Sequence, residues 1–172
     1  DAGKTWKPLL DRLDNPEGYH YYAITRSGED LFIAGEMGLL FRSDDLGKTW
    51  QRLESPYDGS YFGIIGSPEG DFVIAFGLRG STFYSYDRGK SWIRAKKKGF
   101  ASLSAGTFLS DGSFWIAGVD GVVLRSVDRG KTFKNLPTRF PGISSLAEAN
   151  DGNVVLVGLR GSTRVGCTQP GN

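Results

Sequence analysis

A pattern of eight residues that recurs along the chain constrains its fold more than any other feature. It reads Ser-x-Asp-x-Gly-Lys-Thr/Ser-Trp/Phe and occurs in full at residues 43–50, 85–92 and 126–133. The second half of the pattern also opens the chain, at Asp1–Trp6. The aspartates of successive copies are 41 to 44 residues apart. Self-similarity at this period indicates supersecondary units that stack side by side, as the blades of a propeller do.

The residue types of the pattern suit a tight turn between two strands. Serine and aspartate side chains accept hydrogen bonds from nearby backbone N–H groups, and glycine supplies the positive φ of a hairpin. Threonine and an aromatic residue then begin the next strand. A repeat spreads these carboxylates around a circle, so they do not face one another as acid/base pairs would. We therefore assign structural roles to Ser43, Asp45, Gly47, Trp50, Ser85, Asp87, Gly89, Trp92, Ser126, Asp128, Gly130 and Phe133.

These copies resemble the Asp-box, or BNR, repeat of sialidases and many other β-propellers. The resemblance covers nearly the whole chain, with three full copies and one partial copy in register. It implies a propeller in which the Asp-boxes lie on the rim and do no chemistry. It does not by itself imply a function.

The segments between the Asp-boxes predict four strands per repeat. Each repeat contains a nearly continuous apolar run, which is typical of a strand buried on both faces. Another strand and a turn rich in Gly, Asp, Asn and Ser precede the run, and a short loop between two glycines follows it. No segment has a convincing helical period. We predict an all-β fold, a propeller of four-stranded antiparallel blades, with repeats at about residues 19–53, 60–95, 101–136 and 142–165.

The two ends of the chain leave the ring size open. The last repeat lacks a full Asp-box, and residues 1–10 supply the tail of one, so we predict that residues 1–10 complete the fourth blade. Residues 166–172 read as a tail. The chain then closes as a four-bladed ring, pairs with a second copy into an eight-bladed ring, or is part of a longer protein. We favour the last alternative.

Composition excludes several classes of function. A net charge of +2 and a pI near 8.7 fall short of the basic excess of a dedicated nucleic-acid binder. One cysteine, Cys167, cannot form an internal disulfide, and one histidine, His20, cannot complete a zinc site. The Gly-Lys-Thr/Ser triplets lack the earlier glycine of a phosphate-binding loop. We expect no nucleic acid, metal or cofactor.

A glycosidase is the alternative that the sialidase resemblance raises. Sialidases use an arginine cluster, a tyrosine nucleophile assisted by a glutamate, and an aspartate acid/base. Arg79 and Arg160 could recognise a carboxylate. The Arg-Ile-Pro motif is absent, and no glutamate is evidently placed beside a tyrosine. A sialidase-type hydrolase or a carbohydrate-binding propeller is therefore the alternative to a non-enzymatic scaffold.

A basic loop face is the candidate binding site. The repeat places Met37, Arg79, Asp120 and Arg160 at equivalent positions of the loop between the two glycines. Lys96, Lys97 and Lys98 lie before the next repeat and should emerge on the same face. Two arginines and three lysines, Arg79, Arg160 and Lys96–Lys98, would suit an acidic segment of a protein partner or an anionic headgroup.

The cadence Gly-x-x-Gly-x-x-x-x-Ser-x-Asp-x-Gly-Lys-Thr-Trp also resembles the photosystem II stability/assembly factor-like family. Residues 35–50 and 118–133 match it well, and residues 77–92 match it with Ser91 in place of threonine. The resemblance implies a non-enzymatic propeller that holds a membrane-protein partner through an arginine-rich face. It also implies a periplasmic or extracellular location. The smaller number of blades and Phe133 in place of tryptophan depart from the family pattern.

Overall fold

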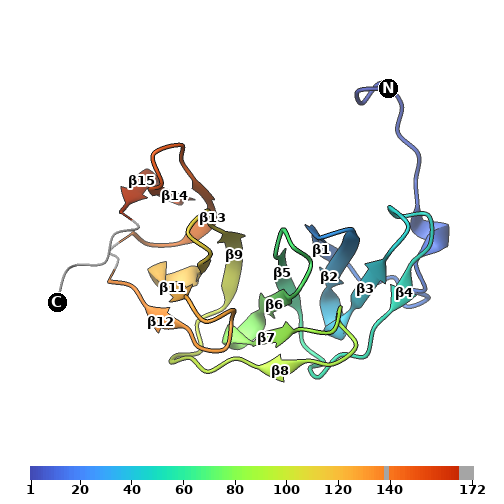
Figure 1. The fold of residues 1–172 in the computed structure, drawn as a ribbon, viewed down its shortest axis with the longest axis horizontal. Helices are drawn as coiled ribbons and strands as arrows, with labels where there is room; N and C mark the ends of the chain where they lie inside the picture. The colour runs from blue at the N-terminus through green and yellow to red at the C-terminus, as the bar shows by residue number, and fades with distance from the viewer. Residues whose placement is uncertain (138–139, 167–172) are drawn as a thin grey trace.

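The chain folds into four antiparallel β-sheets placed side by side along an open arc (Figure 1). This computed structural model describes residues 1–137 and 140–166. Most of the predicted tail, including Cys167, therefore lies outside the described residues. Within the described part, the helical segments are the short 3-10 turns η1 (Leu10–Arg12), η2 (Glu36–Gly38), η3 (Leu78–Gly80) and η4 (Val119–Gly121), and none is long enough to cross a membrane. The predicted all-β fold is confirmed.

Each sheet is one blade, and its strands follow one another in sequence order. Blade 1 contains β1 (Tyr21–Ser27), β2 (Asp30–Gly35), β3 (Leu40–Ser43) and β4 (Gln51–Arg52). Blade 2 contains β5 (Tyr61–Gly66), β6 (Val73–Gly77), β7 (Thr82–Ser85) and β8 (Ile93–Arg94). Blade 3 contains β9 (Leu103–Phe108), β10 (Phe114–Gly118), β11 (Val123–Ser126) and β12 (Lys134–Asn135). Blade 4 contains β13 (Ile143–Glu148), β14 (Val154–Gly158) and β15 (Gly161–Val165). Figure 1 shows β4, β8 and β12 on the convex side of the arc.

The hydrophobic core lies between the blades. Ile74 and Phe76 of blade 2 pack with Phe114 and Ile116 of blade 3 in one cluster, and similar clusters join the other neighbouring blades. The second strand of a blade is therefore covered on both faces, and every residue of β6 and β10 is buried. The corresponding β14 is an exception, because Val157 is 44% exposed on the last blade of the arc.

The predicted closure of the ring by residues 1–10 is wrong for this structure. The fourth sheet has three strands, and residues 1–9 form none. The N-terminal segment extends from η1 away from the sheets, at the other end of the arc from β15 (Figure 1). Asp1 instead closes its own turn onto Thr5, and Trp6 is 88% exposed. Pairing with a second copy and completion by a longer protein stay predictions.

A glycine ends the second strand of every blade because the first strand of the same blade passes very close to it. A Cβ at Gly77 would lie 2.2 Å from Ser60 O and 2.7 Å from Tyr61 Cα. The glycine of each other blade meets the same obstacle, at Gly35, Gly118 and Gly158. The φ of Gly77 is 177°, an extended value open to any residue. Lack of space, rather than backbone freedom, therefore requires glycine here.

A buried ion pair connects blades 1 and 2. Asp30, at the start of β2, is 4% exposed and accepts two hydrogen bonds from Arg42 of β3, at 3.0 and 3.1 Å. Arg88, in the Asp-box turn of blade 2, donates two more, both at 2.6 Å. Burial alone would raise the pKa of Asp30, but the hydrogen bonds from Arg88 and Arg42 lower it to about 2.

Because of this lowered pKa, we expect the protein to lose stability in acid. An aspartate with an ordinary pKa of 3.8 when unfolded, and of about 2 when folded, stabilises the fold above about pH 4. That contribution, roughly 2 kcal/mol, is lost as the pH falls from about 4 through 2. Thermal melts followed by circular dichroism between pH 7 and pH 2 will test this. An Asp30→Asn variant should lose less stability over this range, and equal losses in both proteins would contradict the assignment.

Candidate functional site

Each Asp-box turn is closed by the same set of hydrogen bonds. In the first box, Ser43 Oγ accepts the Gly47 N–H and donates to Asp45 Oδ1, both at 2.8 Å. Asp45 also accepts the N–H and the hydroxyl of Thr49, at 2.9 and 2.7 Å. The boxes at residues 85–92 and 126–133 form the same bonds. The bond from Thr49 N–H, followed by those from the Thr49 and Ser43 hydroxyls, lowers the pKa of Asp45. A carboxylate held ionised in this way closes the turn and is a poor proton donor.

The loops between second and third strands lie at the opposite end of the blades from the Asp-boxes. Connections in an antiparallel sheet alternate between its two ends, so these loops share one end with the segments that lead to the next blade. We call this end the loop face. The middle residues of η2, η3 and η4 are exposed and have left-handed backbones, with φ of 49° at Met37, 54° at Arg79 and 61° at Asp120. In blade 4 the equivalent turn has its positive φ, 97°, at Gly161, next to Arg160.

The three consecutive lysines lie in the segment that joins blades 2 and 3. The Lys96 N–H donates to Lys131 O, and Lys96 O accepts the Phe133 N–H, both at 2.8 Å. This pairing holds the segment against the Asp-box of blade 3, just before β12. A groove of about 530 Å³ results, which we call the basic groove; it is lined by Lys96, Lys97, Lys98, Phe133, Lys134 and Asn135.

Lys97, which lines the basic groove, also lies next to η3. Its Nζ lies so close to Gly80 that a Cβ there would be 2.5 Å away. The neighbouring residue on that loop is Arg79, whose N–H donates to Ser102 Oγ at 3.1 Å. The Arg79 guanidinium has no hydrogen bond or ion pair with the residues that the structure describes. The predicted binding residues Arg79 and Lys97 thus lie on adjoining segments, although Arg79 does not line the groove. The Lys97 ammonium donates to Gly99 O at 2.6 Å, and neither cation forms an ion pair with the described residues.

Two cationic residues that the sequence analysis missed also lie near the lysine run. Lys134 lines the basic groove. Arg94, at the end of β8, lies over the Phe83 ring at 4.6 Å from its centroid. Burial first, and then the charge of Arg94, lower the pKa of Lys97. Arg94 and Lys134 lie in strands, so only the pairing of the blades reveals that they approach the lysine run.

Arg160 does not line the basic groove. It lies in the turn between β14 and β15, two blades along the arc from Arg79. The loop of blade 3, between them, carries the acidic Asp120. The five predicted binding residues therefore divide into a group at blades 2 and 3 and a separate arginine on blade 4.

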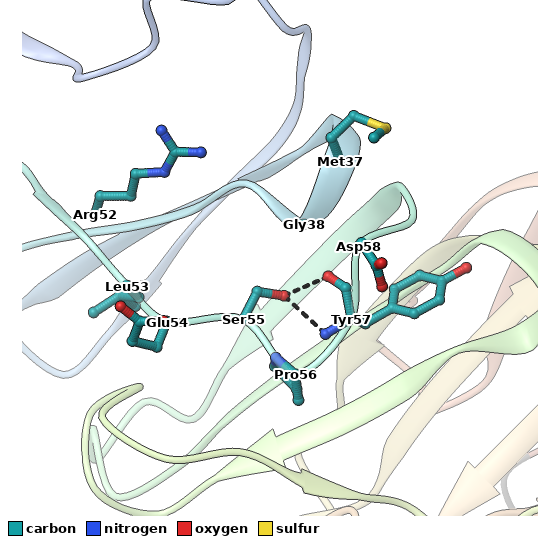
Figure 2. Close-up of a pocket in the computed structure, with 9 residues that line it drawn as sticks. All are labelled: Met37, Gly38, Arg52, Leu53, Glu54, Ser55, Pro56, Tyr57 and Asp58. Atoms are coloured by element: carbon teal, nitrogen blue, oxygen red, sulfur yellow. Dashed lines mark hydrogen bonds between the residues drawn. The ribbon is translucent and has the colours of Figure 1, made fainter.

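A second hollow on the loop face lies between η2 and the segment that joins blades 1 and 2 (Figure 2). Its volume is about 500 Å³. Ser55 stabilises the joining segment, because its Oγ lies 2.6 Å from Tyr57 O and 3.1 Å from the Tyr61 hydroxyl. We call it the blade 1 pocket; its lining residues are Met37, Gly38, Arg52, Leu53, Glu54, Ser55, Pro56, Tyr57 and Asp58.

A glutamate does lie beside a tyrosine, contrary to the sequence analysis. The Tyr22 hydroxyl donates to Glu36 Oε1 at 2.8 Å, and the His20 N–H donates to Glu36 Oε2 at 2.9 Å. The backbone hydrogen bond from His20 and then that from Tyr22 lower the pKa of Glu36. The hydrogen bond to Glu36 raises the pKa of Tyr22. The residues are 14 positions apart in sequence, so only the folding of η2 back onto β1 reveals the pair.

The described residues include no group of three or more His, Cys, Asp or Glu side chains that could hold a metal ion.

Comparison with known proteins supports the repeat assignment. The model of the BNR-Asp box repeat matches residues 40–53. The chain is 24% identical over 161 residues to the photosystem II assembly lipoprotein Ycf48 of Synechococcus sp. (strain CC9902), covering 91% of this chain and 48% of the relative. It is 25% identical over 193 residues to the xyloglucanase Xgh74A of Acetivibrio thermocellus, covering 94% of this chain and 22% of the relative. The chain thus spans about half the length of the first relative and about a fifth of the second.

Solved structures support the fold. The structure of YCF48 bound to D1 peptide matches with a TM-score of 0.68 and 17% identity, over 92% of this chain and 52% of that chain. The WD40 beta propeller domain of Doa1 also matches, with a TM-score of 0.70 and 9% identity, over 84% of this chain and 49% of that chain. These matches establish a β-propeller fold.

Proposed function

Because this chain is a BNR/Asp-box repeat protein with a β-propeller fold, we propose that it is a non-enzymatic scaffold that binds an acidic segment of a partner protein. The basic groove would be the binding site. The observation that carries the proposal is a groove lined by four lysines, one of which, Lys97, lies against the loop that carries the exposed Arg79. Unneutralised cations beside a groove favour an anionic ligand.

The relatives support a protein as the ligand. The Synechococcus relative is a photosystem II assembly lipoprotein, and YCF48 has been solved with a bound D1 peptide. We therefore propose that the partner is a protein that is being assembled, including a segment of a membrane protein. We also propose a location outside the cytoplasm, which the description of the Synechococcus relative as a lipoprotein supports.

Charge reversal of the basic groove should abolish peptide binding. In the Arg79→Glu, Lys96→Glu, Lys97→Glu, Lys98→Glu variant, four attractions of about 0.5–1 kcal/mol each become repulsions. We expect the affinity for a fluorescein-labelled glutamate-rich peptide, measured by anisotropy at low salt, to fall about a hundredfold or more. A second variant, Arg79→Glu, Lys96→Glu, Lys98→Glu, keeps the half-buried Lys97 and so avoids placing a glutamate at a partly buried position. It should still lose most of the affinity for the peptide.

The matched control reverses four lysines near the Asp-boxes and the N-terminus: Lys4, Lys7, Lys48 and Lys90. This change alters the net charge equally and should leave most of the affinity intact. Equal losses in the two variants would show that the peptide responds to overall charge, and no loss in the groove variant would reject the proposed function.

A carbohydrate-active propeller is the second candidate. The similarity to the xyloglucanase Xgh74A and the hydrogen bond between Tyr22 and Glu36 favour it. The lowered pKa of Glu36 makes that carboxylate a weak base for the Tyr22 proton, and the Arg-Ile-Pro motif of sialidases is absent from the sequence. The scaffold therefore remains the proposal that the geometry supports best.

A further inference from the structure

We infer that the blade 1 pocket receives a lysine or arginine side chain from the same acidic segment that occupies the basic groove. The inference rests on the proposed function and adds a specificity to it: the bound segment carries a cation beside its acidic run. Four observations support it, namely the charges of the pocket, its walls, the orientation of Arg52 and the place of the pocket in the repeat.

Two carboxylates that line the pocket are unneutralised. Glu54 and Asp58 are exposed, and neither has a hydrogen bond or ion pair with the described residues. Other carboxylates of the blades, such as Asp71 and Asp111, are paired with arginines. The pocket therefore carries two carboxylates that form no ion pair within the described part of the chain, and a cation from outside would be attracted to them.

The walls of the pocket suit an alkyl chain that ends in a charge. The Tyr57 ring is fixed in place, since it packs edge-on against Tyr61 at 5.7 Å, stacks with Phe83 at 6.1 Å, and donates its hydroxyl to Leu78 O at 3.3 Å. Met37 is 53% exposed from its left-handed position on η2. A flexible thioether and a rigid ring can contact the methylene groups of lysine or arginine while its charge reaches a carboxylate.

The arginine that lines the pocket does not neutralise these carboxylates. Figure 2 shows the Arg52 guanidinium at the upper left of the view, apart from Tyr57 and Asp58. Its Nη1 instead lies 3.4 Å from Asp14 O and 3.8 Å from Glu17 Oε2, on the N-terminal segment. The pocket thus keeps its negative charge next to Tyr57.

The repeat places the pocket and the basic groove one blade apart. The residues at 53–58 and the lysines at 96–98 belong to successive blade-joining segments, and Met37 and Arg79 are equivalent loop residues. An extended segment that runs from blade 1 to the joining segment before blade 3 would therefore meet the two carboxylates and then the lysines. A ligand complementary to both carries a cation at one end and carboxylates at the other.

Synthetic peptides can test whether the bound segment carries a cation on one side of its acidic run. The probes are fluorescein-labelled peptides with a glutamate run and one lysine, placed on either side of the run, and the same peptides with norleucine in place of lysine. For one of the two orders we expect lysine to improve affinity about fivefold over norleucine, as partly exposed charge pairs of about 1 kcal/mol would. In a Glu54→Gln, Asp58→Asn variant this gain should disappear, while the affinity for the norleucine peptide does not fall.

The outcomes separate the two proposals. A glutamate-rich norleucine peptide that fails to bind the wild-type chain rejects the proposed function, and the inference with it. If that peptide binds and lysine adds nothing in either order, the inference alone is rejected. A lysine gain that persists in the Glu54→Gln, Asp58→Asn variant also overturns it, because the cation is then recognised elsewhere. A Glu69→Gln, Asp11→Asn variant, which removes two exposed carboxylates outside the pocket, should retain the gain.

Discussion

Replacing Asp30 by asparagine is expected to lower the free energy of unfolding by about 3–5 kcal/mol. Asp30 neutralises Arg42, which is only 7% exposed, and joins it to Arg88 of the next blade. The substitution leaves the buried guanidinium without a counter-charge and removes an electrostatic link between blades 1 and 2. The loss should lower the melting temperature by roughly 10 °C in a chain of this size. Calorimetry and urea denaturation measure both quantities.

Asp71 provides a matched control, because it forms the equivalent ion pair in blade 2, with the Asp-box arginine of the next blade. Its side chain is 38% exposed and pairs with Arg129, itself 58% exposed. Blade 2 has Tyr84 where blade 1 has Arg42, so no buried cation depends on Asp71. Asp71→Asn should therefore cost about 1 kcal/mol or less. Equal costs for the two substitutions would show that the burial of Arg42 is energetically unimportant.

Gly77→Ala should destabilise the protein by about 3 kcal/mol, near the upper end of the range for overpacking. The added methyl group would lie 2.2 Å from Ser60 O and 2.8 Å from Phe62 N. Both atoms are backbone, so no side-chain rotation relieves the clash and β5 must move away from β6. That movement would weaken the hydrogen bond from Leu78 N–H to Ser60 O, now 2.9 Å long, which fastens η3. Urea denaturation would detect the loss.

Gly152→Ala serves as the comparison for Gly77→Ala. Gly152 has a φ of 78° and open space around it, so alanine there suffers backbone strain of about 1–2 kcal/mol without a clash. If Gly77→Ala lowers the free energy of unfolding no more than Gly152→Ala does, the close approach of β5 is not the reason that position 77 requires glycine.

Much of the fold could be predicted from the sequence because its rules are local. Ser43, Asp45 and Gly47 form a turn by bonds within a few residues, and three copies of that turn set the period of the blades. The apolar runs likewise predicted β6 and β10 as strands buried on both faces. The open arc could not be predicted, because ring closure depends on the angle between blades, which no short pattern encodes.

Less of the candidate site could be predicted. The equivalence of Met37, Arg79 and Asp120 followed from the repeat alone. The approach of Lys97 to Gly80, the hydrogen bond of Tyr22 to Glu36 and the link of Asp30 to Arg88 join residues 14 to 58 positions apart. These contacts depend on how one blade packs on the next or how a loop folds back, and no pattern within a single strand indicates them.

The shared left-handed position of the loops has an evolutionary consequence. A thioether, a guanidinium and a carboxylate occupy it at Met37, Arg79 and Asp120, yet the same backbone hydrogen bond precedes the position in each blade, as from Leu78 N–H to Ser60 O and from Val119 N–H to Ser102 O. The side chain is therefore not what closes the loop. Substitution at this position can change the exposed side chain of one blade without changing the loop side chains of the neighbouring blades. Such a protein can acquire new ligands by single changes, blade by blade, and blade duplication would add another variable position to the series.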